Sequence, residues 1–400
     1  MDRVDIAIVG GGLAAAAAAE SYRQAGGAGD VTIFTQDPDL PVHRPPLSKA
    51  YLRGDETLES VYVHPAQFYR DHEIAVRLNS RVERIDPTDK QLFLEGGETV
   101  AWDKLVLATG ARSRHLQIPG SGLPGLHYLR SLGSAQELQA AYADAKTAVI
   151  IGAGFIGMEV AATLTQQGVF CTVIEMAPRM WPALVPEVTS SYIQRYFEAK
   201  GVRFLLNTGV EALEGDGQVQ SVALSNGTSV PADLVVAGVG AALNVELAAE
   251  AGLRVDRGVV VDDLFRTSSL DVYAVGDIAN FPDPIVGQIH LEHWDNALAQ
   301  GRAVGQTLAG RPEPFRHVAY FFSDLFDLSL NMVGYPAGWD DIEVRGDVEA
   351  GTFTTVYVRH GRVRAALMVN DDADFDHWTS VVAAETAIEG MKSSARLALA

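Results

Sequence analysis

The feature that most constrains this chain is a glycine-rich turn that occurs twice, at residues 10–15 and again at residues 152–157. Each turn stands between a short apolar run and a run with helical spacing, and another apolar run follows the helix. In order along the chain, the flanking runs are residues 4–9, 31–34, 147–151, 158–168 and 171–174. Continuous apolar strands of this kind are typical of parallel sheets that helices cover on both faces. The sequence therefore predicts two right-handed β-α-β units.

The second turn carries the complete dinucleotide-binding pattern, Gly152, Gly154 and Gly157. The first glycine permits a tight turn, the second lets the backbone approach a pyrophosphate, and the third lets helix and strand pack closely. The N-terminus of the helix then offers free N–H groups and partial positive charge to the phosphates. Glu175 ends the next expected strand, so its carboxylate is placed for a ribose 2′-hydroxyl.

The first turn follows the same pattern, with Gly10, Gly12 and an alanine, Ala15, at the third position, which the fingerprint permits. Gln36 lies near the end of the next expected strand and Asp37 just beyond it, and either side chain could reach a ribose. Two such sites in one chain predict two nucleotides, one held tightly and one exchanging.

Charge and composition exclude several functions. The 400 residues carry a formal net charge of −20, so we do not expect the protein to bind the phosphate backbone of a nucleic acid. Cys171 is the one cysteine, which rules out an internal disulfide, an iron–sulfur cluster and a dithiol redox pair; on its buried strand we expect an inert thiol. The ten histidines show no metal-ligand spacing, so no metal is expected.

Compartment and membrane association are read from the same composition. No apolar run reaches the ~20 residues that a membrane-spanning helix needs. A single thiol fits a reducing compartment, and we expect a cytoplasmic protein.

Further elements are expected outside the two units. Residues 105–108 and 272–275 have the pattern of buried strands, and each runs into glycine. Residues 351–358 and 362–369 are rich in Val and Thr and predict an antiparallel hairpin. Residues 374–392 are expected to form a closing helix.

A family resemblance is carried by several sequence blocks in a fixed order. The most specific is Arg44-Pro45-Pro46-Leu47-Ser48-Lys49-Ala50-Tyr51-Leu52. It is followed by Leu107-Ala108-Thr109-Gly110-Ala111, the second glycine turn with Glu159, Val275-Gly276-Asp277, Glu292-His293-Trp294-Asp295-Asn296-Ala297 and Tyr320-Phe321-Phe322-Ser323-Asp324. Over nearly its whole length the chain resembles FAD-dependent NAD(P)H:ferredoxin reductases, including those that serve oxygenases and cytochromes P450, with the apoptosis-inducing-factor-like flavoproteins as a neighbouring branch.

The resemblance implies an α/β fold with two doubly wound, Rossmann-like nucleotide-binding domains and a small α+β C-terminal domain. We expect a discontinuous FAD domain at residues 1–113 and 242–315, an NAD(H) domain at 114–241, and the C-terminal domain at 316–400.

The resemblance also implies which residues serve the cofactors. Around FAD, bound tightly and without a covalent bond, it places Gly10, Gly12, Leu13, Ala14, Ala15, Gln36, Asp37, Arg44, Pro45, Lys49, Val82, Ala108, Thr109, Gly110, Arg130, Gly276, Asp277, Glu292, His293, Trp294, Ala297, Tyr320 and Phe322. Around NAD(H) it places Gly152, Gly154, Phe155, Ile156, Gly157, Glu159, Glu175, Gly238, Val239 and Gly240. Lys49, Glu159 and Trp294 are the expected catalytic residues, with Lys49 and Glu159 meeting near the flavin.

The function implied by the resemblance is hydride transfer from NADH to FAD, followed by single-electron transfers to a separate [2Fe–2S] ferredoxin-type carrier or a rubredoxin. We expect NADH to be preferred, because the carboxylate of Glu175 would repel the extra phosphate of NADPH, although Arg179 would offset part of this repulsion. Arg359, Arg362 and Arg364 on the expected hairpin would form a basic face for an acidic carrier, or are simply solvated.

Two other functions stay open at this point. One is an NADH oxidase or diaphorase that uses oxygen, a quinone or another small acceptor. The other is an NADH-sensing flavoprotein of the apoptosis-inducing-factor type, in which long-lived reduced flavin changes partner binding.

Overall fold

The structure is a computed structural model of the chain and describes residues 2–387. The chain divides into two compact units. Unit 1 consists of Met1–Arg44, Thr57–Arg112 and Ala242–Ala319, and unit 2 consists of Pro45–Glu56, Ser113–Ala241 and Tyr320–Ala400. The chain leaves unit 1 within β7 (Ala111–Ser113) and returns within β16 (Ala241–Leu243), and these two strands form a two-stranded sheet.

A mixed sheet forms the centre of unit 1, in the order β3-β2-β1-β6-β5-β4, with β18 also paired to β6. Strands β1, β2, β3, β6 and β18 pair in parallel, while β4 and β5 form an antiparallel extension of β6. The strands are β1 (Asp2–Val9), β2 (Val31–Phe34), β3 (Ile74–Arg77), β4 (Val82–Asp86), β5 (Gln91–Leu94), β6 (Thr99–Leu107) and β18 (Val272–Ala274). Shorter elements are α3 (Leu58–Val61), α4 (Ala66–Asp71), α8 (Glu246–Glu250), β17 (Val259–Val260), η2 (Gly276–Ile278), β19 (Ala279–Asp283) and β20 (Gly287–Ile289).

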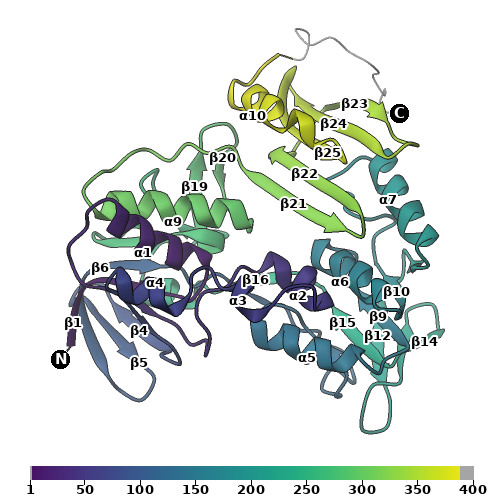
Figure 1. The fold of residues 1–400 in the computed structure, drawn as a ribbon, viewed down its shortest axis with the longest axis horizontal. Helices are drawn as coiled ribbons and strands as arrows, with labels where there is room; N and C mark the ends of the chain where they lie inside the picture. The colour runs from purple at the N-terminus through teal and green to yellow at the C-terminus, as the bar shows by residue number, and fades with distance from the viewer. Residues whose placement is uncertain (1, 388–400) are drawn as a thin grey trace. The chain divides into compact units, whose positions relative to one another are not determined.

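Two helices of unit 1, α1 (Leu13–Gln24) and α9 (Trp294–Leu308), lie side by side (Figure 1). The close approach follows from small residues on both helices. Helix α1 carries a run of six buried alanines, and α9 presents Gly301 and Gly305 to it. A Cβ on Gly301 would lie 2.5 Å from the carbonyl oxygen of Ala14, so only glycine permits this spacing. The N-terminal and late segments of the chain are thereby joined in one core.

A five-stranded parallel sheet in the order β11-β10-β9-β15-β8 forms the nucleotide-binding half of unit 2. Its strands are β8 (Leu126–His127), β9 (Thr147–Ile151), β10 (Phe170–Ile174), β11 (Arg203–Leu205) and β15 (Leu234–Ala237). Three antiparallel strands accompany it, β12 (Val210–Glu214), β13 (Ser221–Leu224) and β14 (Ser229–Pro231). The helices here are η1 (Pro45–Ser48), α2 (Ala50–Arg53), α5 (Leu132–Tyr142), α6 (Phe155–Gln166) and α7 (Glu187–Ala199).

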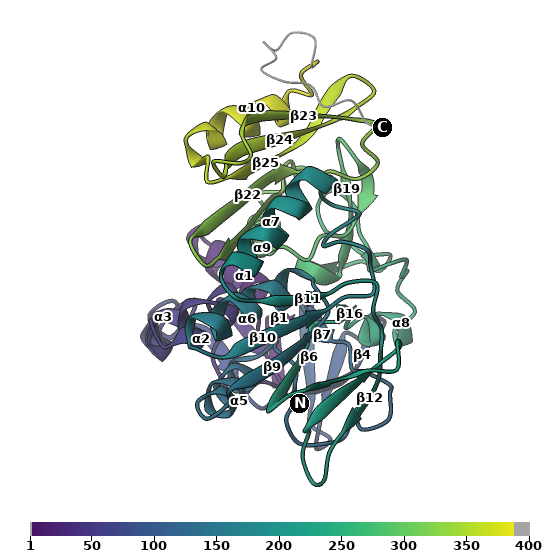
Figure 2. The same ribbon diagram turned by 90° about the vertical axis from the view of Figure 1, so that its right-hand side faces the viewer.

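The last segment of unit 2 is an antiparallel sheet in the order β21-β22-β25-β24-β23. Helix α10 lies on one face of it, against β22 and β25 (Figure 2). The elements are β21 (Tyr320–Leu325), β22 (Leu328–Gly334), β23 (Asp341–Asp347), β24 (Thr352–Arg359), β25 (Arg362–Val369), η3 (Asp372–Asp374) and α10 (Phe375–Ala383). The expected hairpin is confirmed as β24 and β25, with His360 and Gly361 both at positive φ in its two-residue turn.

One expected helix was too long. Helix α10 ends at Ala383, because Glu385 has a φ of 47° and the N–H groups of Glu385 and Thr386 bond back to the carbonyls of Val382 and Val381. These two bonds are those of a Schellman cap, which stops a helix. Residues 388–392 of the expected helix lie outside the described residues.

The fold class is confirmed: the chain has two Rossmann-like sheets with covering helices, one mixed and one parallel, and a small α+β C-terminal domain. The boundaries expected for the three domains stay a prediction.

Candidate functional site

The first glycine turn forms an open cradle at the carboxyl end of β1 in unit 1. Gly10 has a φ of 125°, and a Cβ there would lie 2.1 Å from the carbonyl oxygen of Ala108, so the turn and the end of β6 lie directly together. Gly12 caps α1 and a Cβ on it would meet nothing within 4 Å. The cradle therefore leaves space at the helix N-terminus, where a pyrophosphate would meet backbone N–H groups. These residues fit the FAD that the sequence implies.

The turn that carries Asp277 lies beside this cradle. A Cβ on Gly276, whose φ is 76°, would lie 3.1 Å from the Cβ of Ala14 in α1. The buried amide of Gln300 accepts a hydrogen bond from the Gly276 N–H at 2.8 Å, and Asn296 in turn accepts from Gln300 at 3.3 Å. Helix α9 thus fixes the backbone that presents Asp277. Ala297, another predicted contact, lies 3.9 Å from the same Cβ position.

The segment Ala108-Thr109-Gly110 is held by a residue that the sequence did not single out. Asn244 donates its side-chain amide to the Thr109 carbonyl at 2.8 Å and its backbone N–H to the Gly110 carbonyl at 2.9 Å. The Thr109 hydroxyl returns a bond to the Asn244 carbonyl at 2.6 Å. These three hydrogen bonds hold the backbone just after β6, where three of the predicted FAD contacts lie.

The two candidate ribose ligands differ in exposure. Gln36 is exposed, whereas Asp37 is half-buried and its backbone N–H is bound by the hydroxyl of Thr35 at 3.1 Å. Val82 is buried as the first residue of β4. Which of Gln36 and Asp37 contacts a ribose stays a prediction.

The indole of Trp294 is oriented by His43, the residue that precedes the Arg44 block. Trp294 Nε1 donates to His43 Nδ1 at 3.1 Å, and since an indole N–H can only donate, that nitrogen of His43 carries no proton. Nearby in sequence, the Nε2 of His290 lies 3.8 Å from Glu292 Oε1. Burial lowers the pKa of His293 to about 4, against the opposing influence of Asp277 and Asp295, so this imidazole is neutral at pH 7.

The second glycine turn forms a similar cradle in unit 2. Gly152 has a φ of 97°, and a Cβ there would lie 2.5 Å from the carbonyl oxygen of Gly238. A Cβ on Gly157 would lie 2.2 Å from the Gly152 carbonyl oxygen, which is the close helix–strand packing that the third glycine serves. Gly154 caps α6, and a Cβ on it would meet only the Gly238 carbonyl oxygen within 4 Å, at 3.7 Å. Space for a pyrophosphate therefore remains at the start of α6, between this turn and the segment 238–240.

Glu175 belongs to this cradle through both of its carboxylate oxygens. Oε2 accepts from the Ala153 N–H at 2.8 Å, and Oε1 accepts from the Ala177 N–H at 2.9 Å. The side chain of Met176, next in sequence, is 79% exposed, and that of Ile156 at the start of α6 is 46% exposed. Exposed apolar side chains on both sides of the turn suit a flat nucleobase, and Met176 was not among the predicted contacts.

Arg179 is withdrawn from the surface around Glu175. Its Nη1 donates to the Val185 carbonyl at 2.7 Å and to the Ser190 hydroxyl at 3.1 Å, and its Nη2 donates to the Pro182 carbonyl at 3.1 Å. Its guanidinium is therefore engaged with the chain itself.

The two predicted catalytic residues of unit 2 meet. Lys49 Nζ lies 2.8 Å from Glu159 Oε1, and the two side chains are 10% and 3% exposed. Ser48 and Ser323 also donate to the Glu159 carboxylate, at 2.5 and 2.6 Å. A buried charge pair of this kind is tolerated because every charged atom has partners. Neither serine was predicted to have a role.

The aromatic residues of β21 surround the same region of unit 2. The Phe322 ring centroid lies 5.6 Å from Lys49 Nζ, within reach of a cation–π interaction. The Tyr320 hydroxyl donates to Asn331 at 2.6 Å, and its ring contacts Phe375 edge-on. Phe155 packs between Phe321 and Trp181.

The predicted FAD residues are divided between the two units. Most lie in unit 1, whereas the following lie in unit 2: Pro45, Lys49, Arg130, Tyr320 and Phe322. Arg130 precedes the capping box of α5, and its backbone N–H is bound by the Ser134 hydroxyl. The site roles of these residues stay predictions. The structure adds residues for which no role was predicted: His43, Ser48, Met176, Asn244, Asn296, Gln300 and Ser323.

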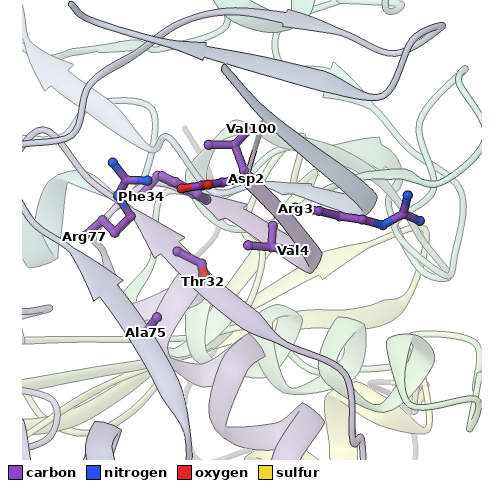
Figure 3. Close-up of a pocket in the computed structure, with 8 residues that line it drawn as sticks. All are labelled: Asp2, Arg3, Val4, Thr32, Phe34, Ala75, Arg77 and Val100. Atoms are coloured by element: carbon purple, nitrogen blue, oxygen red, sulfur yellow. The ribbon is translucent and has the colours of Figure 1, made fainter. Parts of the chain in front are cut away.

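A pocket of about 290 Å³ in unit 1 is separate from the glycine cradle (Figure 3). It is lined by Asp2, Arg3, Val4, Thr32, Phe34, Ala75, Arg77 and Val100, none of which is a predicted nucleotide contact. Arg77 is paired with Glu98 through two 2.7 Å bonds and lies over the Phe34 ring, and Arg3 is paired with Asp103. Its positive charges are thus already neutralised, and we assign it no ligand.

The described residues lack two kinds of feature. Among residues 2–387, no cluster of three or more His, Cys, Asp or Glu side chains is arranged to hold a metal ion. Within the same part of the chain, no helix combines the length and apolar character that crossing a membrane requires.

Two open glycine cradles, each at the carboxyl ends of parallel strands, define the class: a protein that binds two dinucleotides. Comparison with known proteins identifies the family. Residues 4–301 match the pyridine nucleotide-disulphide oxidoreductase family, and residues 320–394 match the reductase C-terminal domain. The chain belongs to the pyridine nucleotide-disulphide oxidoreductase family, and it is an NAD(P)H-dependent oxidoreductase.

Individual relatives cover almost the entire chain. It is 38% identical to rhodocoxin reductase of Rhodococcus erythropolis, across 96% of this chain and 90% of that protein. It is 35% identical to a rubredoxin-NAD(+) reductase of Pseudomonas putida, across 91% of this chain and 95% of that protein. Among solved structures, the reductase in the covalent putidaredoxin reductase–putidaredoxin complex superposes with a TM-score of 0.93 at 33% identity, covering 96% of this chain and 93% of that one. The predicted family and its cofactors, FAD and a pyridine nucleotide, are confirmed.

Proposed function

We propose that this protein passes electrons from NADH through bound FAD to a separate carrier, either a [2Fe–2S] ferredoxin or a rubredoxin, that feeds an oxygenase or a cytochrome P450. The observation that carries the proposal is the pair of open glycine cradles together with the buried Lys49–Glu159 ion pair. The relatives support the carrier class, because one is a rubredoxin reductase and another forms a complex with putidaredoxin.

Bound FAD would supply the redox chemistry, since it accepts two electrons together and releases them singly. The protein's part is binding, orientation and electrostatics. In unit 1, the N-terminus of α1 would hold the pyrophosphate, Asp277 would accept from a ribityl hydroxyl, and Trp294 would present a ring whose orientation His43 fixes. In unit 2, the N-terminus of α6 would hold the NADH pyrophosphate. We propose that the ammonium of Lys49 stabilises the negative charge that arrives on the flavin.

The protein is proposed to prefer NADH over NADPH. A carboxylate about 4 Å from a 2′-phosphate costs up to ~4 kcal/mol at an effective dielectric of 20. Glu175 is fixed by two backbone N–H groups, and Arg179, which would compensate, is bound to carbonyls of its own segment. The test is kcat/KM for both coenzymes with a one-electron acceptor, and a higher value with NADPH would contradict this preference.

The function is tested by anaerobic stopped-flow spectroscopy of the FAD-loaded protein with NADH, then with a panel of ferredoxins and rubredoxins. We expect NADH to bleach the protein-bound flavin. One carrier should then reoxidise it faster than free reduced flavin reduces the same carrier. A persistent long-wavelength band that no carrier removes would instead favour an NADH sensor. Rapid aerobic NADH consumption without any carrier would favour an oxidase or diaphorase.

We also propose a cytoplasmic location, because the cytoplasm supplies NADH. Cell fractionation tests it, and recovery of the protein outside the cytoplasmic fraction would refute it.

For the domains, we keep the division at residues 1–113 with 242–315, 114–241 and 316–400 as a proposal. It would fail if limited proteolysis cut preferentially within these segments rather than near their ends.

A further inference from the structure

We propose that Ser48 and Ser323 are positioning residues, which hold the Glu159 carboxylate and, through it, the ammonium of Lys49 in one fixed geometry. The inference rests on the proposed function, in which Lys49 stabilises charge on the flavin. It adds two residues that support Lys49 from separate parts of the chain, one at the end of the short helix η1 and one in the strand β21.

The contacts leave neither carboxylate oxygen unoccupied. Oε1 receives Lys49 Nζ at 2.8 Å and the Ser323 hydroxyl at 2.6 Å, and Oε2 receives the Ser48 hydroxyl at 2.5 Å. A carboxylate paired with an ammonium only accepts, so both serines donate. Hydrogen bonds to an ionised group are short and strong, as these distances are. The carboxylate therefore cannot rotate about its last bond without breaking one of them.

Burial makes these bonds decisive. Ser48 is 2% exposed, Ser323 is 0% exposed and the Glu159 side chain is 3% exposed, so water does not replace a lost hydroxyl at low cost. An ion pair away from solvent is stabilised only when the remaining lone pairs are satisfied. Removal of either serine hydroxyl leaves one carboxylate oxygen short of a donor, and the Lys49–Glu159 geometry loosens.

Ser48 directly precedes Lys49 in the sequence, and its backbone is held by α6, the helix that carries Glu159. The hydroxyl of Thr163, one turn further along α6, donates to the backbone carbonyl of Ser48 at 2.8 Å. Helix α6 is thus bound to η1 by two hydrogen bonds, one at Glu159 and one from Thr163. The backbone from which Lys49 extends is held by the same two side chains.

Ser323 brings the C-terminal sheet into this arrangement. Phe155 and Glu159 lie one turn apart on α6, and they face Phe321 and Ser323, alternate residues of β21. Four residues of a helix span about 6.0 Å and two strand residues about 6.8 Å, so the two pairs have similar spacing. The ring pair, with centroids 4.2 Å apart, therefore sets the register that delivers the Ser323 hydroxyl to Glu159.

The test compares Ser323→Ala and Ser48→Ala with the wild-type FAD-loaded protein. A bond to a charged group is strong enough for about a tenfold effect. We expect each variant to lower the equilibrium constant for two-electron flavin reduction about tenfold, which is a potential lower by about 30 mV. Ser323→Thr keeps the hydroxyl and is expected to restore the wild-type potential. Ser21→Ala is the matched control, because this buried serine donates to the carbonyl of Arg302, and its loss lowers Tm without moving the potential.

A parallel variant, Lys49→Gln, separates failure of this inference from failure of the proposed function. If Lys49→Gln leaves the flavin potential unchanged, the role proposed for Lys49 itself is wrong. If Lys49→Gln shifts the potential but Ser323→Ala and Ser48→Ala lower only Tm, the two serines are merely structural and the inference is overturned. If one alanine variant does not fold, the other carries the same test, since each serine holds a different carboxylate oxygen.

Discussion

Glu175 combines two tasks in one side chain. Its carboxylate closes the glycine turn through the N–H groups of Ala153 and Ala177, and the same charge would meet the 2′ position of a bound coenzyme. A glutamine loses the charge and keeps one acceptor oxygen for one of these two N–H groups, whereas its NH₂ group cannot accept from the other.

We expect Glu175→Gln to lower the ratio of kcat/KM for NADH to that for NADPH about tenfold, since most of the repulsion of a 2′-phosphate is removed. Glu187→Gln, which removes an exposed acid from α7 in the same unit, is the control and leaves the ratio unchanged. An unchanged ratio in Glu175→Gln would show that another group discriminates between the coenzymes.

Cys171 is expected to be chemically inert in the folded protein. Burial raises the pKa of its thiol to about 11, the side chain is 0% exposed, and the thiolate is the reactive form. Iodoacetamide should leave it unlabelled at pH 8 until denaturant is added, and Cys171→Ala should retain carrier reduction. Fast labelling of the native protein would contradict the buried position.

His293 makes stability depend on acid. Burial lowers its pKa to about 4 from 6.5, so the unfolded state binds this proton first as the pH falls. Keeping His293 neutral costs no free energy of unfolding above pH 6.5, and the free energy of unfolding falls as the pH drops from 6.5 toward 4. With about 1.4 kcal/mol per pKa unit, the loss is roughly 3 kcal/mol. Denaturant unfolding at several pH values should therefore show a shallower acid loss for His293→Asn than for the wild type; parallel curves would refute it.

At the scale of elements, the crossing of α1 and α9 sets the spacing under the first cradle. A Cβ on Gly301 would meet the Ala14 carbonyl oxygen at 2.5 Å and the Ala17 Cβ at 2.9 Å, and neither can move away without shifting a helix. Gly301→Ala should cost about 1–3 kcal/mol of stability and weaken FAD retention. Thermal unfolding and FAD content measure both effects. In the control, Gly122→Ala, the added Cβ meets nothing within 4 Å, so equal losses in the two variants would contradict the argument.

Elements were predictable where one local pattern was enough. Strands at 31–34 and 147–151 match β2 and β9 because unbroken apolar runs between turns have few other uses. The hairpin was predictable because its turn residues accept positive φ. The Ser48–Glu159–Ser323 contacts were not, since the partners are 111 and 164 residues apart and a serine hydroxyl carries no periodic signal. The end of α10 was missed because a glutamate, rather than a glycine, takes the left-handed position there.

For the whole molecule, net charge governs the encounter with a carrier. The protein carries a net charge of −20. On the hairpin, Arg364 is paired with the Glu385 carboxylate, which offsets its charge, whereas Arg362 donates to the backbone carbonyl of Glu385. With an acidic ferredoxin we expect kcat/KM for the carrier to rise between about 10 mM and 150 mM salt, because screening weakens the repulsion. A neutral small acceptor is the control, and its rate should not respond. A fall with salt would show that a local basic face dominates.

The pairing of α1 with α9 has a consequence for biosynthesis. Residues 13–24 leave the ribosome early, but the helix that covers their alanine face ends at Leu308. At about 5–20 residues per second, translation takes roughly 15–60 s to supply that cover. During this interval the nascent chain already contains the complete segment 113–241, but the first nucleotide-binding fold still lacks helix α9. We therefore expect flavin insertion to follow the synthesis of α9.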